Sequence, residues 1–186
     1  MSDTPTYLKD SAQLITQAGF ATCQTWYHGT ASGLVSSIME QGLKQSGDMA
    51  LKQKAKSTIT TIGDSFKEHK EPVFLTQSKE LAYFWACAAS ENHNKFFAKD
   101  DEPVVLAITL PTELNDTIKP DVGAAAVILA GGNDYFDLLD VIYKKNNLQT
   151  PRIDPNTANR MEYLALLGMA YSKKNIAAQY IKVMTK

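Results

Sequence analysis

The chain has 186 residues, of which 44% are hydrophobic and 21% are charged, and its formal net charge at pH 7 is −1. These values are typical of a folded globular protein and exclude an intrinsically disordered one. The near-zero net charge also excludes a strong overall attraction to nucleic acid or an anionic membrane, although a local basic patch leaves nucleic acid open as a partner. The length suits one domain, so we expect a single soluble domain over residues 1–186.

Nothing in the sequence resembles a signal peptide or a transmembrane helix. Residues 1–9 are polar, and the longest apolar run, residues 123–132, is too short to span a bilayer. We therefore expect no membrane partner and a cytoplasmic location, with a secreted effector as the alternative. Cys23 and Cys87 have neither the spacing of metal ligands nor a disulfide framework, and we expect no metal site.

The N-terminal part of the chain predicts a short helix followed by a strand. Residues 1–10 are polar and are expected to form a loose arm. Residues 11–18 carry apolar side chains at helical spacing, and Gly19 suits the end of that helix. Residues 22–27 include aromatic side chains that favour a strand.

This strand leads into a turn formed by His28, Gly29 and Thr30. Gly29 has no Cβ, which permits a sharp turn or a close approach to a ligand. Residues 34–41 predict a short helix, and Gly42 suits its C-terminal cap. A histidine ring, a bare backbone and a hydroxyl can together bind a nucleotide sugar or an amide. A locally packed turn is the alternative interpretation.

The central part of the chain predicts a long loop between ordered elements. Residues 44–70 have weak periodicity and are expected to be either a functional loop or a mobile insertion. Residues 72–76 predict a short strand, and Ser78 can cap a helix that runs to about Ser90. Residues 91–101 are expected to form a hairpin-like loop.

The C-terminal half begins with an apolar strand within residues 103–111, of the kind that is buried on both faces. Residues 112–120 predict a loop, and residues 134–143 predict a helix. Residues 160–170 are compatible with either a helix or a strand, and residues 175–186 end in a closing strand.

Three blocks of sequence occur in the order found in a known enzyme superfamily. They are Tyr27-His28-Gly29-Thr30 with the helix that ends at Gly42, then residues 73–83 with the strand 103–108, then Met161-Glu162-Tyr163 with residues 175–181. Together they resemble the ADP-ribosyltransferase superfamily in its His-Tyr-Glu branch, which includes the poly-ADP-ribose polymerases and the diphtheria-toxin group. They also resemble the RNA 2′-phosphotransferases and the rifampin ADP-ribosyltransferases.

The resemblance implies an α+β fold with two small packed β-sheets around an NAD cleft and helices at the edges. It implies an NAD-dependent mono-ADP-ribosyltransferase that cleaves the nicotinamide–ribose bond and transfers ADP-ribose to an acceptor. NAD is then a substrate, and the acceptor is a protein, a nucleic acid or a small molecule. Residues 44–70 would select the acceptor, and residues 112–158 form an insertion that diverges from the family.

The resemblance also implies roles for individual residues. His28 would hold the adenosine ribose of NAD, Gly29 would bind the nicotinamide carboxamide through its backbone, and Thr30 would support the adenosine sugar. Phe74 takes the place of the family's tyrosine, which keeps the aromatic surface and loses the hydroxyl. Tyr83 would stack on the nicotinamide ring.

Glu162 corresponds to the family's catalytic glutamate. Cleavage of the nicotinamide–ribose bond builds positive charge on the sugar, and a fixed carboxylate stabilises that charge. Asp154 is the alternative, because it lies in an Asp-Pro-Asn context similar to that of the rifampin enzymes. His69 and His93 fall in polar segments and are interpreted as exposed.

Two other functions remain open for the same fold. One is a catalytically inactive module that binds a nucleotide or a partner. The other is an RNA 2′-phosphotransferase, which is disfavoured because that family has an Arg-His pair where this chain reads Pro72-Val73-Phe74.

Overall fold

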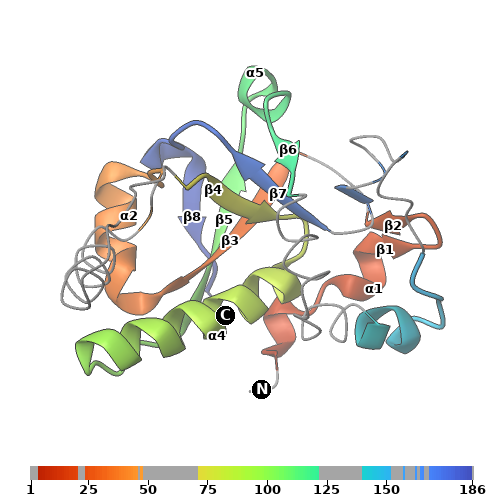
Figure 1. The fold of residues 1–186 in the computed structure, drawn as a ribbon, viewed down its shortest axis with the longest axis horizontal. Helices are drawn as coiled ribbons and strands as arrows, with labels where there is room; N and C mark the ends of the chain where they lie inside the picture. Colours follow the sequence, from red (N-terminus) through yellow and green to blue (C-terminus); the bar gives the residue numbers. More distant parts are fainter. Residues whose placement is uncertain are drawn as a thin grey trace, which may run out of the picture.

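The computed structural model describes residues 4–20, 24–45, 47, 71–121, 140–151, 157, 162, 164–165 and 168–185. Within these ranges the chain forms a six-stranded antiparallel sheet, helices packed against it and a separate two-stranded hairpin (Figure 1). The prediction of a fold that mixes helices and strands is confirmed. None of the helices in the described ranges combines the length and the apolar character that a membrane span needs.

Residues 140–145 are helical. The other helices and strands follow in chain order. They are η1 (Thr6–Leu8), α1 (Ser11–Leu14), β1 (Ile15–Thr16), β2 (Gly19–Phe20), β3 (Thr25–Ala31), η2 (Ser32–Leu34), α2 (Val35–Gln41), β4 (Val73–Thr76), α4 (Lys79–Phe97), β5 (Pro103–Thr109), α5 (Thr112–Asn115), β6 (Lys119–Pro120), β7 (Met169–Ser172), η3 (Ala178–Tyr180) and β8 (Ile181–Val183).

The large sheet consists of two halves that meet at one point. Its strand order is β6-β7-β4-β3-β5-β8. Strand β3 pairs with β5 along its whole length but pairs with β4 only at Tyr27 and Thr76. The resemblance implied two packed sheets; in the described residues the halves β6-β7-β4 and β3-β5-β8 are instead joined edge to edge. The reason is that the backbones of β3 and β4 come within pairing distance at this one position and diverge beyond it.

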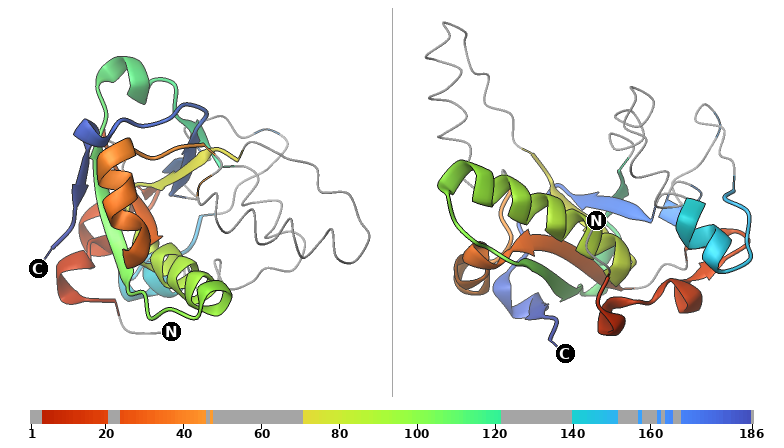
Figure 2. Two further views of the ribbon diagram at one scale, coloured as in Figure 1. Left: turned by 90° about the vertical axis from the view of Figure 1, so that its left-hand side faces the viewer. Right: turned by 90° about the horizontal axis from the view of Figure 1, so that it is seen from below.

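The long helix α4 covers one face of the sheet, where it packs on β3 and β5 (Figure 2). Side chains alternate between the two faces of a strand, so Tyr27 and Gly29 face α4 while Trp26 and His28 face away from it. A Cβ built on Gly29 would lie 2.1 Å from the carbonyl oxygen of Ala82 and 2.4 Å from the amide nitrogen of Ala86. The backbones of α4 and β3 are therefore in direct contact at Gly29.

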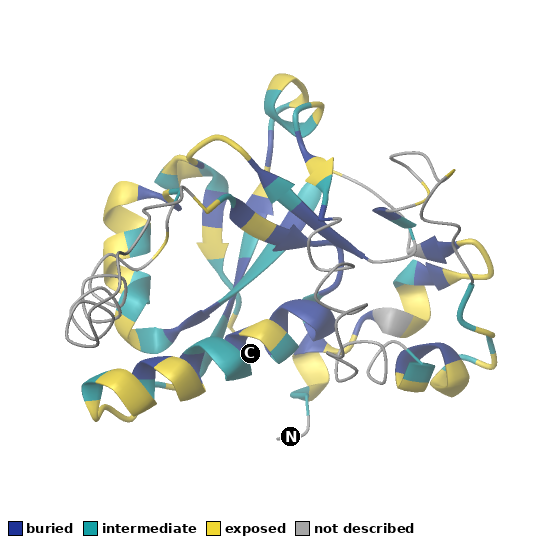
Figure 3. Cartoon of the chain, viewed as in Figure 1, coloured by how far each residue is buried: buried dark blue, intermediate teal, exposed yellow. Residues whose placement is uncertain are grey.

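Figure 3 shows buried residues along the strands of the sheet and along α4, and the hydrophobic ones form separate clusters. Val105 belongs to a cluster on the α4 side, with Leu8 and Tyr83, whereas Leu106 belongs to a larger cluster with Trp26 on the other side. Both Val105 and Leu106 are almost fully buried. The prediction that this strand is buried on both faces is confirmed.

The N-terminal arm differs from its prediction, because residues 4–10 are packed and not loose. Leu8 is buried against α4, and the Asp10 carboxylate accepts hydrogen bonds from the Ser78 hydroxyl and the Lys79 amide, both at 2.7 Å. Ser78 caps α4, as predicted, by accepting a hydrogen bond from the Leu81 amide. A buried carboxylate at a helix N-terminus satisfies amides that have no partner within the helix and interacts well with the helix dipole.

Two predicted boundaries are wrong. His28, Gly29 and Thr30 do not form a turn, because β5 continues to pair with β3 through Ala31. Helix α4 does not end near Ser90: it runs to Phe97 and stops where Ala98 adopts a left-handed conformation, so most of the loop predicted at 91–101 is helix.

The remaining predictions have mixed outcomes. The strand at 72–76 and the closing strand within 175–186 are confirmed by β4 and β8. The helix over 34–41 is confirmed as α2, and Gly42 ends it with φ 78° while its amide donates to Ile38. The helix predicted over 11–18 ends at Leu14, because the next residues pair as the β1–β2 hairpin.

Most of two predicted segments lies outside the described residues. These are residues 46 and 48–70 of the long loop, and residues 122–139, 152–156 and 158 of the divergent insertion. The described part of the insertion contains α5 and β6, although residues 112–120 were expected to form a loop.

Candidate functional site

A cleft of about 530 Å³ opens where β3 and β4 diverge. Its walls come from β3, from α2 and the residues after it, from the start of β4 and from the C-terminal half of α4. A volume of this size falls within the range of small-molecule sites in proteins, roughly 300–1,000 Å³.

Four residues expected to bind NAD line this one cleft: His28, Gly29, Thr30 and Phe74. The first three come from β3, and Phe74 comes from β4. Phe74 is 45% exposed, which is unusual for a phenylalanine in the interior of a sheet and leaves its ring available at the cleft wall.

The His28 side chain connects the two halves of the sheet. Its Nδ1 lies 2.8 Å from the carbonyl oxygen of Phe74. A carbonyl oxygen only accepts hydrogen bonds, so Nδ1 carries the proton, and in the neutral ring Nε2 is a hydrogen-bond acceptor. Burial lowers the pKa of His28 below its ordinary value of 6.5, and the hydrogen bond to Phe74 opposes this only in part. The neutral ring is therefore favoured at neutral pH.

The lowered pKa of His28 has an expected effect on stability. As the pH falls below 6.5, the unfolded chain binds a proton on this histidine before the folded protein does. The free energy of unfolding should therefore decrease as the pH falls from 6.5 to the lower pKa of the folded state. Urea unfolding of the wild type and His28→Gln at a series of pH values measures this effect. The difference in stability between the two proteins should change across that window; a constant difference would contradict a depressed pKa.

The structure does not bring Tyr83 to the cleft. Tyr83 is 8% exposed and packs with Leu8 and Val105 in the core. Trp85 is 38% exposed and lies one helical turn before Ala89, which lines the cleft. Trp85 itself is not among the residues that line the cleft.

Glu162 is exposed and is not among the cleft-lining residues. A Cβ on Gly19 would lie 2.3 Å from the carbonyl oxygen of Ala165, so this part of the chain lies beside the β1–β2 hairpin. In Figure 1 that hairpin and α2, which lines the cleft, lie at opposite sides of the molecule. Asp154 lies outside the described residues.

Three charged or titratable residues of the cleft were missed by the sequence analysis: Lys44, Glu71 and His93. Glu71 is the only carboxylate among the described lining residues. Lys44 is exposed, and its Nζ donates to the Gln41 side chain at 2.7 Å. Lys44 is the first residue of the long segment predicted as a loop, and Glu71 directly follows that segment, where periodicity carries no information about position.

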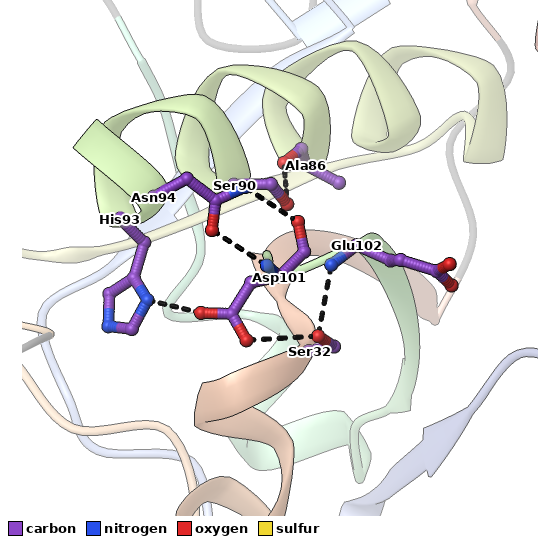
Figure 4. Close-up of polar contacts among 7 residues, drawn as sticks. All are labelled: Ser32, Ala86, Ser90, His93, Asn94, Asp101 and Glu102. Atoms are coloured by element: carbon purple, nitrogen blue, oxygen red, sulfur yellow. Dashed lines mark hydrogen bonds and ion pairs between the residues drawn. The ribbon is translucent and has the colours of Figure 1, made fainter. Parts of the chain in front are cut away.

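His93 is buried, although it was expected to be exposed. It is 6% exposed, and its Nδ1 lies 2.5 Å from the Asp101 carboxylate (Figure 4). The error follows from the length of α4, since His93 lies on the helix and its ring packs on that of Phe97, with the centroids 4.6 Å apart. A longer helical pattern that includes Ala86 and Ser90 would have placed His93 on the buried face.

In comparisons of the chain with protein-family models, curated proteins and solved structures, no match was found. Within the described ranges, no group of three or more potential metal-ligating side chains is present. The cleft and its residues are therefore the basis for inferring a function.

Proposed function

We propose that this protein is an NAD-dependent mono-ADP-ribosyltransferase. The observation that carries the proposal is the cleft between the halves of the sheet, because it gathers His28, Gly29, Thr30 and Phe74. The family resemblance implies an NAD-binding role for each of these residues, and they come from two strands that are far apart in the chain.

The geometry of His28 supports a role in binding a sugar. With Nδ1 engaged by Phe74, the neutral ring presents Nε2 as an acceptor for a ribose hydroxyl. Gly29 is packed against α4 on its Cα side, so what it offers to the cleft is its backbone. The Thr30 side chain is buried beside His28 and supports this end of the site.

The aromatic and cationic residues support binding of the rest of NAD. The exposed face of Phe74 suits the planar, positively charged nicotinamide ring. Lys44 supplies a positive charge at the cleft for the diphosphate. In this assignment Tyr83 does not stack on the ring, because it lies in the core.

The chemistry requires one negative charge close to the reacting sugar. The nicotinamide–ribose bond breaks with its electron pair moving to nicotinamide, which leaves as a neutral molecule and needs no general acid. The sugar becomes oxocarbenium-like, and a carboxylate in the cleft stabilises it. The resemblance assigns this role to Glu162, with Asp154 as the alternative, whereas Glu71 is supported by its position in the cleft.

The test is incubation of the protein with NAD, with nicotinamide release and NAD affinity measured separately. His28→Ala is expected to weaken NAD binding about 2- to 10-fold, since one hydrogen bond contributes roughly 0.5–1.5 kcal/mol. Met39→Ala is the control, because Met39 is on α2, is exposed and does not line the cleft. Affinity for NAD without nicotinamide release under any acceptor condition would identify an inactive binding module. Absence of NAD binding would end the proposal.

A further inference from the structure

A buried histidine–carboxylate pair lies in the wall of the cleft. His93, near the end of α4, lines the cleft, and its Nδ1 bonds to the Asp101 carboxylate in the loop before β5. Both side chains are nearly excluded from water, with exposed fractions of 8% and 11%. The roles assigned above to the cleft residues do not use this pair.

Asp101 is held in place from three directions (Figure 4). The Ser32 hydroxyl donates to its second carboxylate oxygen at 3.2 Å, and the Asn94 side chain bonds to both its backbone amide and its backbone carbonyl. Burial acts to raise the pKa of Asp101, but the hydrogen bonds from His93 and Ser32 and the charges of His93 and Lys99 outweigh it and hold the pKa below 3.8. The carboxylate is therefore ionised at neutral pH.

An ionised carboxylate accepts and does not donate hydrogen bonds, so the proton on Nδ1 of His93 is fixed there. Any proton exchanged by the ring then passes through Nε2. This arrangement, an imidazole oriented by a carboxylate, is the one that enzymes use to stabilise the imidazolium formed when a histidine takes a proton. His28 differs, because its Nδ1 faces a neutral carbonyl.

We infer that His93, positioned by Asp101, is the general base that accepts the proton of a hydroxyl acceptor in this cleft. The inference rests on the proposed function and names its acceptor class: a neutral O–H nucleophile. The C1′–N bond of NAD breaks and its electron pair leaves with nicotinamide. A bond forms between the acceptor oxygen and C1′, and the acceptor's proton passes to Nε2 of His93, which becomes an imidazolium paired with the Asp101 carboxylate.

The need for a base follows from the charge of the acceptor. A hydroxyl that attacks C1′ becomes a positively charged oxonium unless it loses its proton, and a histidine titrates near the pH at which such a transfer is effective. The charged groups near the His93–Asp101 pair in the described residues include Lys99 on the adjoining loop, and Lys44 and Glu71 line the same cleft. His28, with its neutral ring, is a further titratable group of the cleft.

The test uses methanol as the O–H acceptor and measures the formation of methyl ADP-ribose from NAD, alongside hydrolysis to ADP-ribose. His93→Gln keeps a side chain able to donate to Asp101 but cannot take a proton. Its rate of methyl ADP-ribose formation is expected to fall on the order of 10²-fold, at the lower end of general-base effects. NAD affinity should stay within about two-fold, because binding does not use the base. The pH dependence of the rate should differ between the wild type and His93→Gln, because the variant has no group at this position that accepts a proton.

Asn94→Ala separates proton transfer from simple anchoring of the loop. It removes both side-chain bonds to the Asp101 backbone and leaves the imidazole–carboxylate pair intact. Asn94→Ala is expected to lower thermal stability without changing the pH dependence of methyl ADP-ribose formation. Asp101→Asn, by contrast, should shift that pH dependence. If the wild type is active and His93→Gln is equally active with the same pH profile, this inference is overturned and the proposed function is retained. A wild type that forms neither product from NAD would overturn both.

Discussion

Gly29→Ala is expected to lower the free energy of unfolding by ~3 kcal/mol, at the upper end of the usual cost of overpacking. The added methyl group would lie 2.1 Å and 2.4 Å from backbone atoms of Ala82 and Ala86. Backbone atoms of a helix cannot rotate away as the end of a side chain can, so α4 has to move off the sheet as a unit. Such a movement would also disturb the cleft wall that α4 contributes.

Thermal unfolding followed by circular dichroism measures this effect, with an expected decrease in Tm of about 6–12 °C for a domain of this size. Gly47→Ala is the matched control. Gly47 has a φ of 52° and nothing within 4 Å of its added Cβ, so it should cost only the strain of a left-handed alanine, roughly 1 kcal/mol. Equal stability of Gly29→Ala and the wild type would contradict the direct contact between α4 and β3.

Gly29 also illustrates what the sequence predicts and what it leaves open. The sequence indicated that Gly29 is important but not why, because a glycine in a turn and a glycine at a close packing contact have the same local sequence pattern. The contact that requires glycine comes from Ala82 and Ala86, which belong to a helix far along the chain. The start of β3, the helix α2 and the start of α4 depend mainly on local periodicity and caps, and these were predicted correctly. The part of β3 that carries Gly29 was predicted as a turn, because its strand conformation depends on pairing with β5.

The candidate site likewise combines residues that the sequence predicts with residues whose positions depend on tertiary packing. His28, Thr30 and Phe74 line one cleft, as the family resemblance implied. The sequence indicated the strand of Phe74, but it predicted a turn at His28 and Thr30, which lie on β3. Tyr83 and Trp85 are both aromatic and lie two residues apart, so composition cannot decide which faces the core. That choice depends on how α4 is rotated against Leu8 and β5, which is a tertiary property.

The second large effect is expected from the carboxylate that lines the cleft, Glu71. Glu71→Gln should lower nicotinamide release on the order of 10²–10³-fold, as does the loss of one preorganised electrostatic group in other enzymes. The amide is almost isosteric with the carboxylate, so packing is kept while the negative charge is lost. Because that charge matters most when the sugar is oxocarbenium-like, kcat should fall while NAD affinity remains nearly unchanged.

Glu162→Gln and Asp154→Asn are the comparisons that decide the assignment. Glu162 is exposed and lies outside the cleft, so its charge is screened by solvent and its substitution should change turnover by less than about two-fold. A large loss in Glu162→Gln with full activity in Glu71→Gln would exclude Glu71 and support the assignment implied by the family resemblance. A loss confined to Asp154→Asn would support the pattern of the rifampin-modifying enzymes. The physical requirement is the same in each case: the essential carboxylate must lie within a few ångströms of the sugar, because its stabilisation of charge decreases with distance and with exposure to water.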